Sequence, residues 1–174
     1  MALRKIVLEG DDILRKKSKA VTVFDERLHE LLDDMWETMT DANGVGLAAP
    51  QVGIIRRAVV IDVTPRQAAS DEVVETAREN PPEQTAQMKY ELINPVISYA
   101  EGETEESEGC LSIPGVSGMV KRPKIVRVKA QDRYGKEFEV TGAGLLAKAL
   151  CHEIDHLEGI LFTDIATSLE EPES

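Results

Sequence analysis

The chain has 174 residues, of which 42% are hydrophobic and 30% are charged, and its formal net charge is −12. A chain of this length can bury a full hydrophobic core within one domain, and its composition is that of an ordinary globular protein. The negative charge disfavours direct binding to nucleic-acid phosphates, and no apolar run is long enough to span a membrane.

The N-terminal sequence, residues 1–9, becomes charged before the apolar stretch of a signal peptide could form. We therefore expect the protein to remain in the cytoplasm. Cytosolic thiols are kept reduced, so we expect Cys110 and Cys151 to be free rather than joined in a disulfide. Free cysteines of this kind serve in packing, in catalysis or as metal ligands.

The first predicted element is an amphipathic helix. Its apolar residues recur at three- and four-residue steps, which is typical of one buried stripe: Leu28, Leu31, Leu32, Met35 and Met39. Asp25 is a suitable N-cap, and Ala42-Asn43-Gly44 is a suitable stop. The run Ala58–Val63 is rich in β-branched residues and predicts a strand.

Residues 64–88 interrupt this pattern with Pro, Gln, Glu, Ala and Ser, and we interpret them as a surface insertion. Extended segments are expected to resume at 90–93 and at 96–99. The acidic stretch 101–108 is expected to be exposed to solvent.

The C-terminal part predicts two strands at 120–129 and 136–141, joined by a turn at Asp132–Gly135. Residues 143–157 then predict a helix that Gly159 could end. The acidic tail 167–174 is expected to be disordered, which leaves residues 1–166 as a single domain. The order of helix, short strands and helix predicts an α+β fold.

The pentapeptide His152-Glu153-Ile154-Asp155-His156 contains two of the three histidines of the chain. Residues four apart lie on the same face of a helix, so both imidazoles could bind one divalent cation. The intervening Glu153 is near enough to handle the proton of a metal-bound water. The same spacing also arises by chance on charged helix faces, so this motif alone leaves the question open.

The third metal ligand would decide the class of enzyme. In short zinc endopeptidases it lies downstream, but no histidine follows His156, and Glu170 and Glu171 lie in the tail that is expected to be disordered. Upstream, Cys110 stands in polar, glycine-containing surroundings that suit a loop. One thiolate with two imidazoles leaves a fourth tetrahedral position open for water. Cys110 is therefore the preferred third ligand, whereas Cys151 is interpreted as a packing residue.

The segment Gly44–Gln51 is a glycine-containing turn that lacks the lysine and the spacing of a phosphate-binding loop. Gln51 is its residue of chemical interest, because a side-chain amide can donate a hydrogen bond to a developing oxyanion.

Three segments together resemble the peptide deformylase family: Gly44-Val-Gly-Leu-Ala-Ala-Pro-Gln51, Glu108-Gly-Cys-Leu-Ser112 and His152-Glu-Ile-Asp-His156. They occur in the family's order, and the resemblance runs from about Ile6 to about Asp164. It implies an α+β fold in which antiparallel strands pack around a central metal-binding helix. It also implies hydrolysis of the formyl group from N-formylmethionine at the start of nascent polypeptides, with release of formate.

The resemblance also implies roles for individual residues. Three are expected to bind the metal: Cys110, His152 and His156. Three are expected to act in catalysis: Glu153 as general acid and base, and Gln51 with the backbone N–H of Leu111 as oxyanion donors. Four are expected to line the methionine-binding groove: Val45, Gly46, Glu108 and Leu145. Asp155 is expected to support the ligand imidazoles, which usually need an anchoring acceptor; its other interpretation is a plain surface carboxylate.

One thiolate with two imidazoles suits zinc, iron, cobalt or nickel. The resemblance implies one divalent ion per chain, Fe2+ in the cell and Zn2+, Ni2+ or Co2+ in purified samples. The implied partners are N-formylmethionyl nascent chains, with transient association with the ribosome. Two alternatives stay open at this point. One is a short zinc endopeptidase of the His-Glu-x-x-His type, and the other is a related fold that binds metal only structurally.

Overall fold

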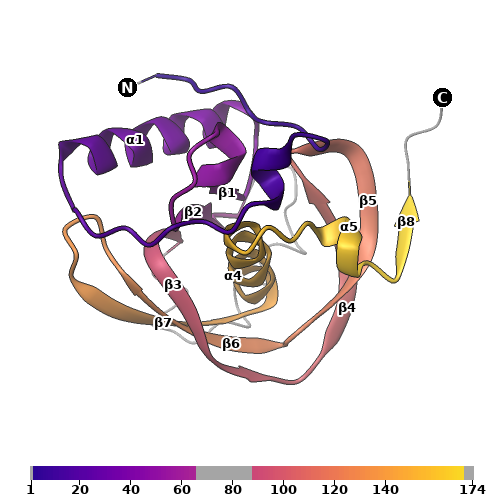
Figure 1. Ribbon diagram of the computed structural model, residues 1–174. Coiled ribbons are helices and arrows are strands. Elements are labelled where there is room, and N and C mark those ends of the chain that lie inside the picture. Colours follow the sequence, from indigo (N-terminus) through magenta and orange to yellow (C-terminus); the bar gives the residue numbers. More distant parts are fainter. Residues whose placement is uncertain (1, 66–87, 171–174) are drawn as a thin grey trace.

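The computed structural model describes residues 2–65 and 88–170 (Figure 1). Its elements in chain order are η1 (Asp12–Arg15), α1 (Glu26–Asp41), β1 (Gly46–Ala48), η2 (Ala49–Val52), β2 (Ala58–Asp62), β3 (Lys89–Glu101), β4 (Thr104–Cys110), β5 (Ile113–Arg122), β6 (Ile125–Gln131), β7 (Glu137–Ala143), α4 (Gly144–Leu157), α5 (Phe162–Ile165) and β8 (Ser168–Glu170). The described strands pair in antiparallel fashion, so the predicted α+β fold is confirmed.

The strands form two sheets, one with the order β1-β2-β3-β6-β7 and one with the order β4-β5-β8. Helix α4 contacts strands of both sheets and is seen end-on near the middle of Figure 1. Its side chains Leu146, Leu150 and Leu157 are buried in a core cluster that also contains Val128 of β6 and Val140 of β7. This packing holds α4 at the junction of the two sheets.

The predicted amphipathic helix is formed as α1. Asp25 has extended backbone and its carboxylate accepts a hydrogen bond from the backbone N–H of Leu28 at 3.2 Å, which satisfies a donor of the first turn. The predicted apolar stripe is buried and packs against β2 residues such as Val60. The helix ends before Asn43, which has a φ of 58°.

Two predicted strand boundaries differ in the structure. The segments predicted at 90–93 and 96–99 belong to one strand, β3, whose register shifts around Asn94. Asn94 has a φ of 52°, and its side chain bonds with the backbone of Val21 and with Gln131. The strand predicted at 120–129 is instead two strands, β5 and β6, separated at Pro123, which has no N–H for a ladder.

The acidic stretch 101–108 is largely exposed to solvent, as predicted, and Glu108 is its exception. Most of it forms β4, which pairs with β5, and Glu108 is only 6% exposed. Immediate neighbours along a strand face opposite sides of the sheet, so Glu108 can be buried while Ser107 and Gly109 beside it are exposed. The buried carboxylate is stabilised by an equally buried base, Arg122.

The first part of the tail that was predicted to be disordered is instead a strand. Ser168–Glu170 form β8, which pairs with β5. Gly118 of β5 permits this approach, because a Cβ there would lie 2.7 Å from the carbonyl oxygen of Ser168. Residues 171–174, and the part of the predicted insertion from 66 to 87, lie outside the described residues.

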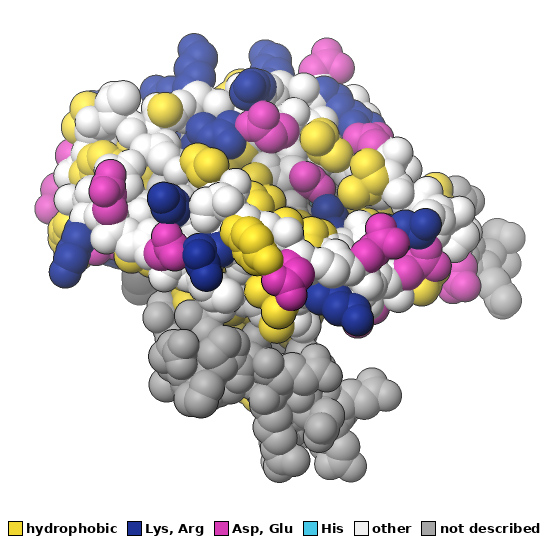
Figure 2. Space-filling model, turned by 90° about the horizontal axis from the view of Figure 1, so that it is seen from below, with side chains coloured by type: hydrophobic (Ala, Val, Ile, Leu, Met, Phe, Trp, Pro, Cys, Tyr) yellow, Lys and Arg dark blue, Asp and Glu magenta, His cyan; other side chains and the backbone are white. Residues whose placement is uncertain are grey.

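The outer surface seen from below in Figure 2 carries hydrophobic, acidic and basic side chains interspersed with one another. Among the described helices, none combines the length and the hydropathy that crossing a membrane requires. Cys110 and Cys151 are both free, and Cys151 is buried in the core as predicted.

Candidate metal centre

The three predicted metal ligands lie together in space. Cys110 ends β4 beside a register shift rather than lying in a loop, and His152 and His156 lie one turn apart on α4. One ligand atom from each residue lies within 4.8 Å of the other two, and Sγ of Cys110 is 3.3 Å from Nε2 of His156. One sulfur and two nitrogens at these separations fit a tetrahedral divalent cation with one open position.

A buried ion-pair network holds the ring of His152. A carboxylate only accepts hydrogen bonds, so Nδ1 of His152 donates to Oε1 of Glu108, at 2.9 Å, and Nε2 remains for the metal. Glu108 also accepts from Nε and Nη2 of Arg122, at 2.8 and 2.9 Å. Nη1 of Arg122 donates to Oδ2 of Asp155 at 2.7 Å. A carboxylate behind a ligand imidazole fixes the ring and its tautomer and raises its basicity.

This network connects Asp155 to His152 indirectly. The sequence predicts that Asp155 supports the ligand imidazoles, and in the structure Asp155 bonds to Arg122 and reaches His152 through Arg122 and Glu108. Glu108 lines the cavity, as expected for a groove residue, and is in addition the group that anchors His152. Sequence reasoning missed Arg122 because it lies outside the three motifs. The available signal was its position two residues after Val120 in a predicted strand, which places both side chains on the same face of the sheet.

The charges of the network favour a cation at the site. Burial would raise the pKa of Glu108, but hydrogen bonds from Arg122 and His152 lower it to about 2. Burial would likewise lower the pKa of His152, but Glu153, Cys110 and Glu108 raise it to about 10. The same groups that raise this pKa, Glu153, Cys110 and Glu108, would also stabilise a divalent cation held at the ligand atoms.

Two buried atoms beside the cluster have no hydrogen-bond partner among the described residues: Oε1 of Glu153 and Nδ1 of His156. Buried polar atoms are normally paired, so an unpaired carboxylate oxygen marks a place for a ligand or a water molecule. The other oxygen of Glu153, Oε2, lies 4.0 Å from Nε2 of His152, and burial raises the pKa of Glu153 to about 7. The residues present therefore fit a bound metal ion with a water in its open position.

Gln51 is 1% exposed and its amide has a fixed orientation. Its Oε1 accepts from the backbone N–H of Ala48 at 2.9 Å, so the NH2 group must point the other way. Nε2 donates to Oγ of Ser112 at 3.1 Å and lies 3.5 Å from Sγ of Cys110. An amide donor held beside the metal ligands has the orientation that an oxyanion donor needs.

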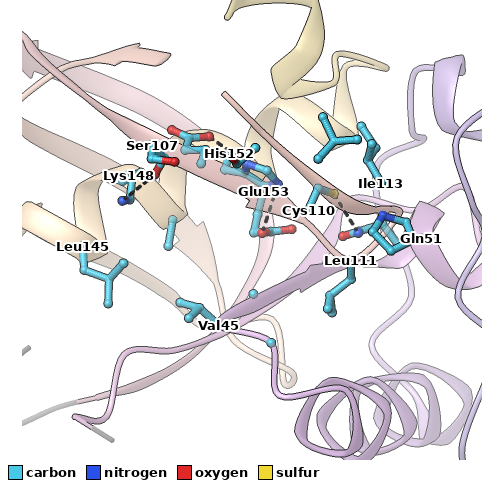
Figure 3. A pocket seen from close by; sticks show the side chains of 18 of the residues that line it. Val45, Gln51, Ser107, Cys110, Leu111, Ile113, Leu145, Lys148, His152 and Glu153 are labelled. Carbon is cyan, nitrogen blue, oxygen red and sulfur yellow. Dashed lines mark hydrogen bonds and ion pairs between the residues drawn. The ribbon is translucent and has the colours of Figure 1, made fainter. Parts of the chain in front are cut away.

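A cavity of about 530 Å3 adjoins these groups (Figure 3). All four residues predicted for the groove line it: Val45, Gly46, Glu108 and Leu145. Leu145 and Lys148 lie to one side of His152 and Glu153, and Leu111 lies to the other. The volume is within the usual range for a small-molecule site, about 300–1,000 Å3.

Gly46 is expected to be essential for the position of Glu153. A Cβ at residue 46 would lie 2.6 Å from Oε2 of Glu153, so the buried carboxylate would have to turn away. We expect Gly46→Ala to lower kcat by about 10²-fold, the usual effect of misplacing a reacting group by about 1 Å. The metal content, measured by elemental analysis, should not change.

Gly109→Ala is the matched control, because Gly109 also lines the cavity and its added Cβ would meet only the carbonyl oxygen of Val116, at 3.6 Å. A Gly46→Ala variant that is as active as Gly109→Ala would show that the crowding of Glu153 is harmless.

Comparison with known proteins agrees with this site. A family model for polypeptide deformylase matches residues 3–172. The chain is 54% identical over 164 residues to the peptide deformylase of Caldicellulosiruptor bescii, covering 94% of this chain and 86% of the relative. It is similar to the crystal structure of a peptide deformylase from Legionella pneumophila, with 45% identity, a TM-score of 0.79 and coverage of 95% and 86%.

A second solved structure, a peptide deformylase from Synechococcus elongatus in complex with actinonin, shares 38% identity and a TM-score of 0.78, with coverage of 94% and 78%. The similarity thus spans both the fold and the segments that form the metal cluster. The chain therefore belongs to the peptide deformylase family, metal-dependent hydrolases that remove the N-formyl group from nascent polypeptides.

Proposed function

We propose that Cys110, His152 and His156 hold one divalent ion and that the adjoining cavity binds the N-formylmethionine of a nascent polypeptide. The observation that carries this assignment is the convergence of one sulfur and two imidazole nitrogens beside a buried carboxylate oxygen that lacks a partner among the described residues. A purely structural metal site would need no such carboxylate. Glu170, the described candidate ligand for an endopeptidase, lies exposed on β8 opposite Ser117 and outside the cluster.

The residues divide the chemistry among them. When bound, the divalent ion would supply Lewis-acid activation, which lowers the pKa of water towards neutrality. Oε1 of Glu153 takes the proton of the attacking water and returns it to the amine nitrogen as the C–N bond breaks, a transfer worth about 10²–10⁴-fold. Nε2 of Gln51 and the backbone N–H of Leu111 donate to the oxyanion, each donor worth about 2.7–4 kcal/mol.

The finer biological assignments are also proposals. The donor set suits iron, zinc, nickel and cobalt, and the family resemblance favours Fe2+ in the cell with the other ions in purified samples. Because the substrate is a nascent polypeptide, we place the protein in the cytoplasm with transient ribosome association. Actinonin, bound in the Synechococcus relative, is a suitable ligand for competition experiments with this chain.

The proposal is tested by measuring formate release from formyl-Met-Ala-Ser. The assay uses the iron-loaded protein under anaerobic conditions. We expect turnover in wild type, and Cys110→Ser should lose it, because a hydroxyl replaces the thiolate ligand. Its metal affinity should also fall. The fall should exceed about 10–100-fold, which is the usual effect of removing a residue that only supports a metal ligand. Full turnover with retained metal in Cys110→Ser would favour the endopeptidase alternative. An inactive iron-loaded wild type would refute the enzymatic assignment.

A further inference from the structure

Lys148 is the only lysine or arginine among the described residues that line the cavity. It lies on α4 three residues after Leu145 and four before His152, so the three side chains share one helix face. Figure 3 places Lys148 and Leu145 on the side of the cavity away from Cys110 and Gln51. The end of the cavity that Leu145 lines therefore has an ammonium group in its wall.

This ammonium group is held only loosely. Nζ of Lys148 donates to Oε2 of Glu106 and to the carbonyl oxygen of Ser107, both at 3.3 Å. An ammonium has three N–H donors, so the described residues use two of them. The side chain of Glu106 is 52% exposed, and a pair of this kind in contact with water contributes little to stability. Lys148 can therefore donate to a further acceptor in the cavity without breaking a strong interaction.

An apolar pocket with one hydrogen-bond donor at its end can discriminate between methionine and methionine sulfoxide. The thioether of methionine is only a weak acceptor, so the donor adds little to the binding of methionine. Oxidation to methionine sulfoxide keeps the carbon skeleton but adds a polar, chiral S=O group. Such a group is costly to bury without a hydrogen bond, whereas a bond from a cation is about twice as strong as a neutral one.

We propose that Lys148 is a specificity-determining residue that lets this site deformylate polypeptides beginning with N-formylmethionine sulfoxide. This inference rests on the proposed function, because it places the first side chain at the end of the cavity lined by Val45 and Leu145. The sulfoxide oxygen accepts the hydrogen bond from Nζ of Lys148, and the hydrolysis itself is unchanged.

The test compares kcat/KM for formyl-Met-Ala-Ser, for each sulfoxide epimer of that peptide, and for formyl-norleucyl-Ala-Ser. Wild type is expected to hydrolyse one epimer with a kcat/KM within about tenfold of that for methionine, because a hydrogen bond to a charged donor is directional. The sulfoxide ratio is kcat/KM for the preferred sulfoxide epimer divided by kcat/KM for formyl-Met-Ala-Ser. In Lys148→Met this ratio should fall by about 10–100-fold, the usual effect of losing such a hydrogen bond. The norleucine-to-methionine ratio should stay within about threefold, since neither side chain is a strong acceptor.

Three further variants sharpen the test. Lys148→Arg keeps a cationic donor and should retain a sulfoxide ratio above that of Lys148→Met. Glu106→Gln keeps the ammonium and removes its carboxylate partner, so its ratio should equal or exceed that of wild type. Lys136→Met removes an exposed lysine of the β6–β7 turn and should leave every ratio as in wild type.

An unchanged sulfoxide ratio in Lys148→Met would overturn the proposal. So would a loss in Glu106→Gln as large as that in Lys148→Met, or rejection of both epimers by a wild type that hydrolyses formyl-Met-Ala-Ser. Failure on formyl-Met-Ala-Ser itself would instead count against the proposed function.

Discussion

Glu153→Gln is expected to lower kcat for formyl-Met-Ala-Ser by about 10²–10⁴-fold, because an amide can neither take up nor return the proton. The carboxylate is buried beside the proposed metal ligands, with Oε2 4.0 Å from Nε2 of His152. Glutamine has the same length and shape, so the close contact with Gly46 is kept. The loss should therefore appear in kcat while the metal content and KM change little.

Elemental analysis of the same preparation, combined with the formate assay, measures both quantities. Glu158→Gln is a useful control at the C-terminal end of the same helix, where the carboxylate pairs with Arg57 and Lys17 outside the cavity. It should leave kcat unchanged. If metal-loaded Glu153→Gln keeps a kcat close to that of Glu158→Gln, another group must move the proton.

Arg122→Met is expected to weaken metal binding and the fold together. The guanidinium is 6% exposed and binds two carboxylates, Glu108 and Asp155, so its removal leaves the buried Glu108 with only the hydrogen bond from His152. Breaking a buried pair in this way costs about 3–5 kcal/mol of unfolding free energy. Glu108 then no longer holds His152 firmly, and loss of such a supporting group lowers metal affinity by about 10–100-fold.

Denaturant unfolding of the metal-free protein and calorimetric titration with Co2+ measure the two effects separately. Arg127→Met is the matched control, because Arg127 forms an exposed ion pair with Glu139 on the adjacent strands β6 and β7. Exposed pairs contribute only about 0–1 kcal/mol, so this variant should resemble wild type in both experiments. Equal Co2+ affinity in the two arginine variants would show that the ring of His152 needs no support from Arg122.

Features that depend on neighbours in the chain were determined by the sequence itself. The periodic apolar residues and the cap at Asp25 predict α1, and the structure confirms both. The spacing of His152 and His156 places them on one helix face wherever that helix packs. Such patterns can be read without tertiary information because helix geometry relates residues only a few positions apart.

Features that depend on distant segments were decided only by the tertiary structure. The pairing of β4 with β5 buries Glu108 against Arg122, and this makes one residue of an otherwise exposed acidic stretch the support of a proposed metal ligand, His152. The close approach of Glu153 to the backbone of Gly46 likewise arises where β1 meets α4. The sequence lists acidic residues without saying which one a buried arginine will neutralise. That choice follows from strand register and burial, which only the packed chain defines.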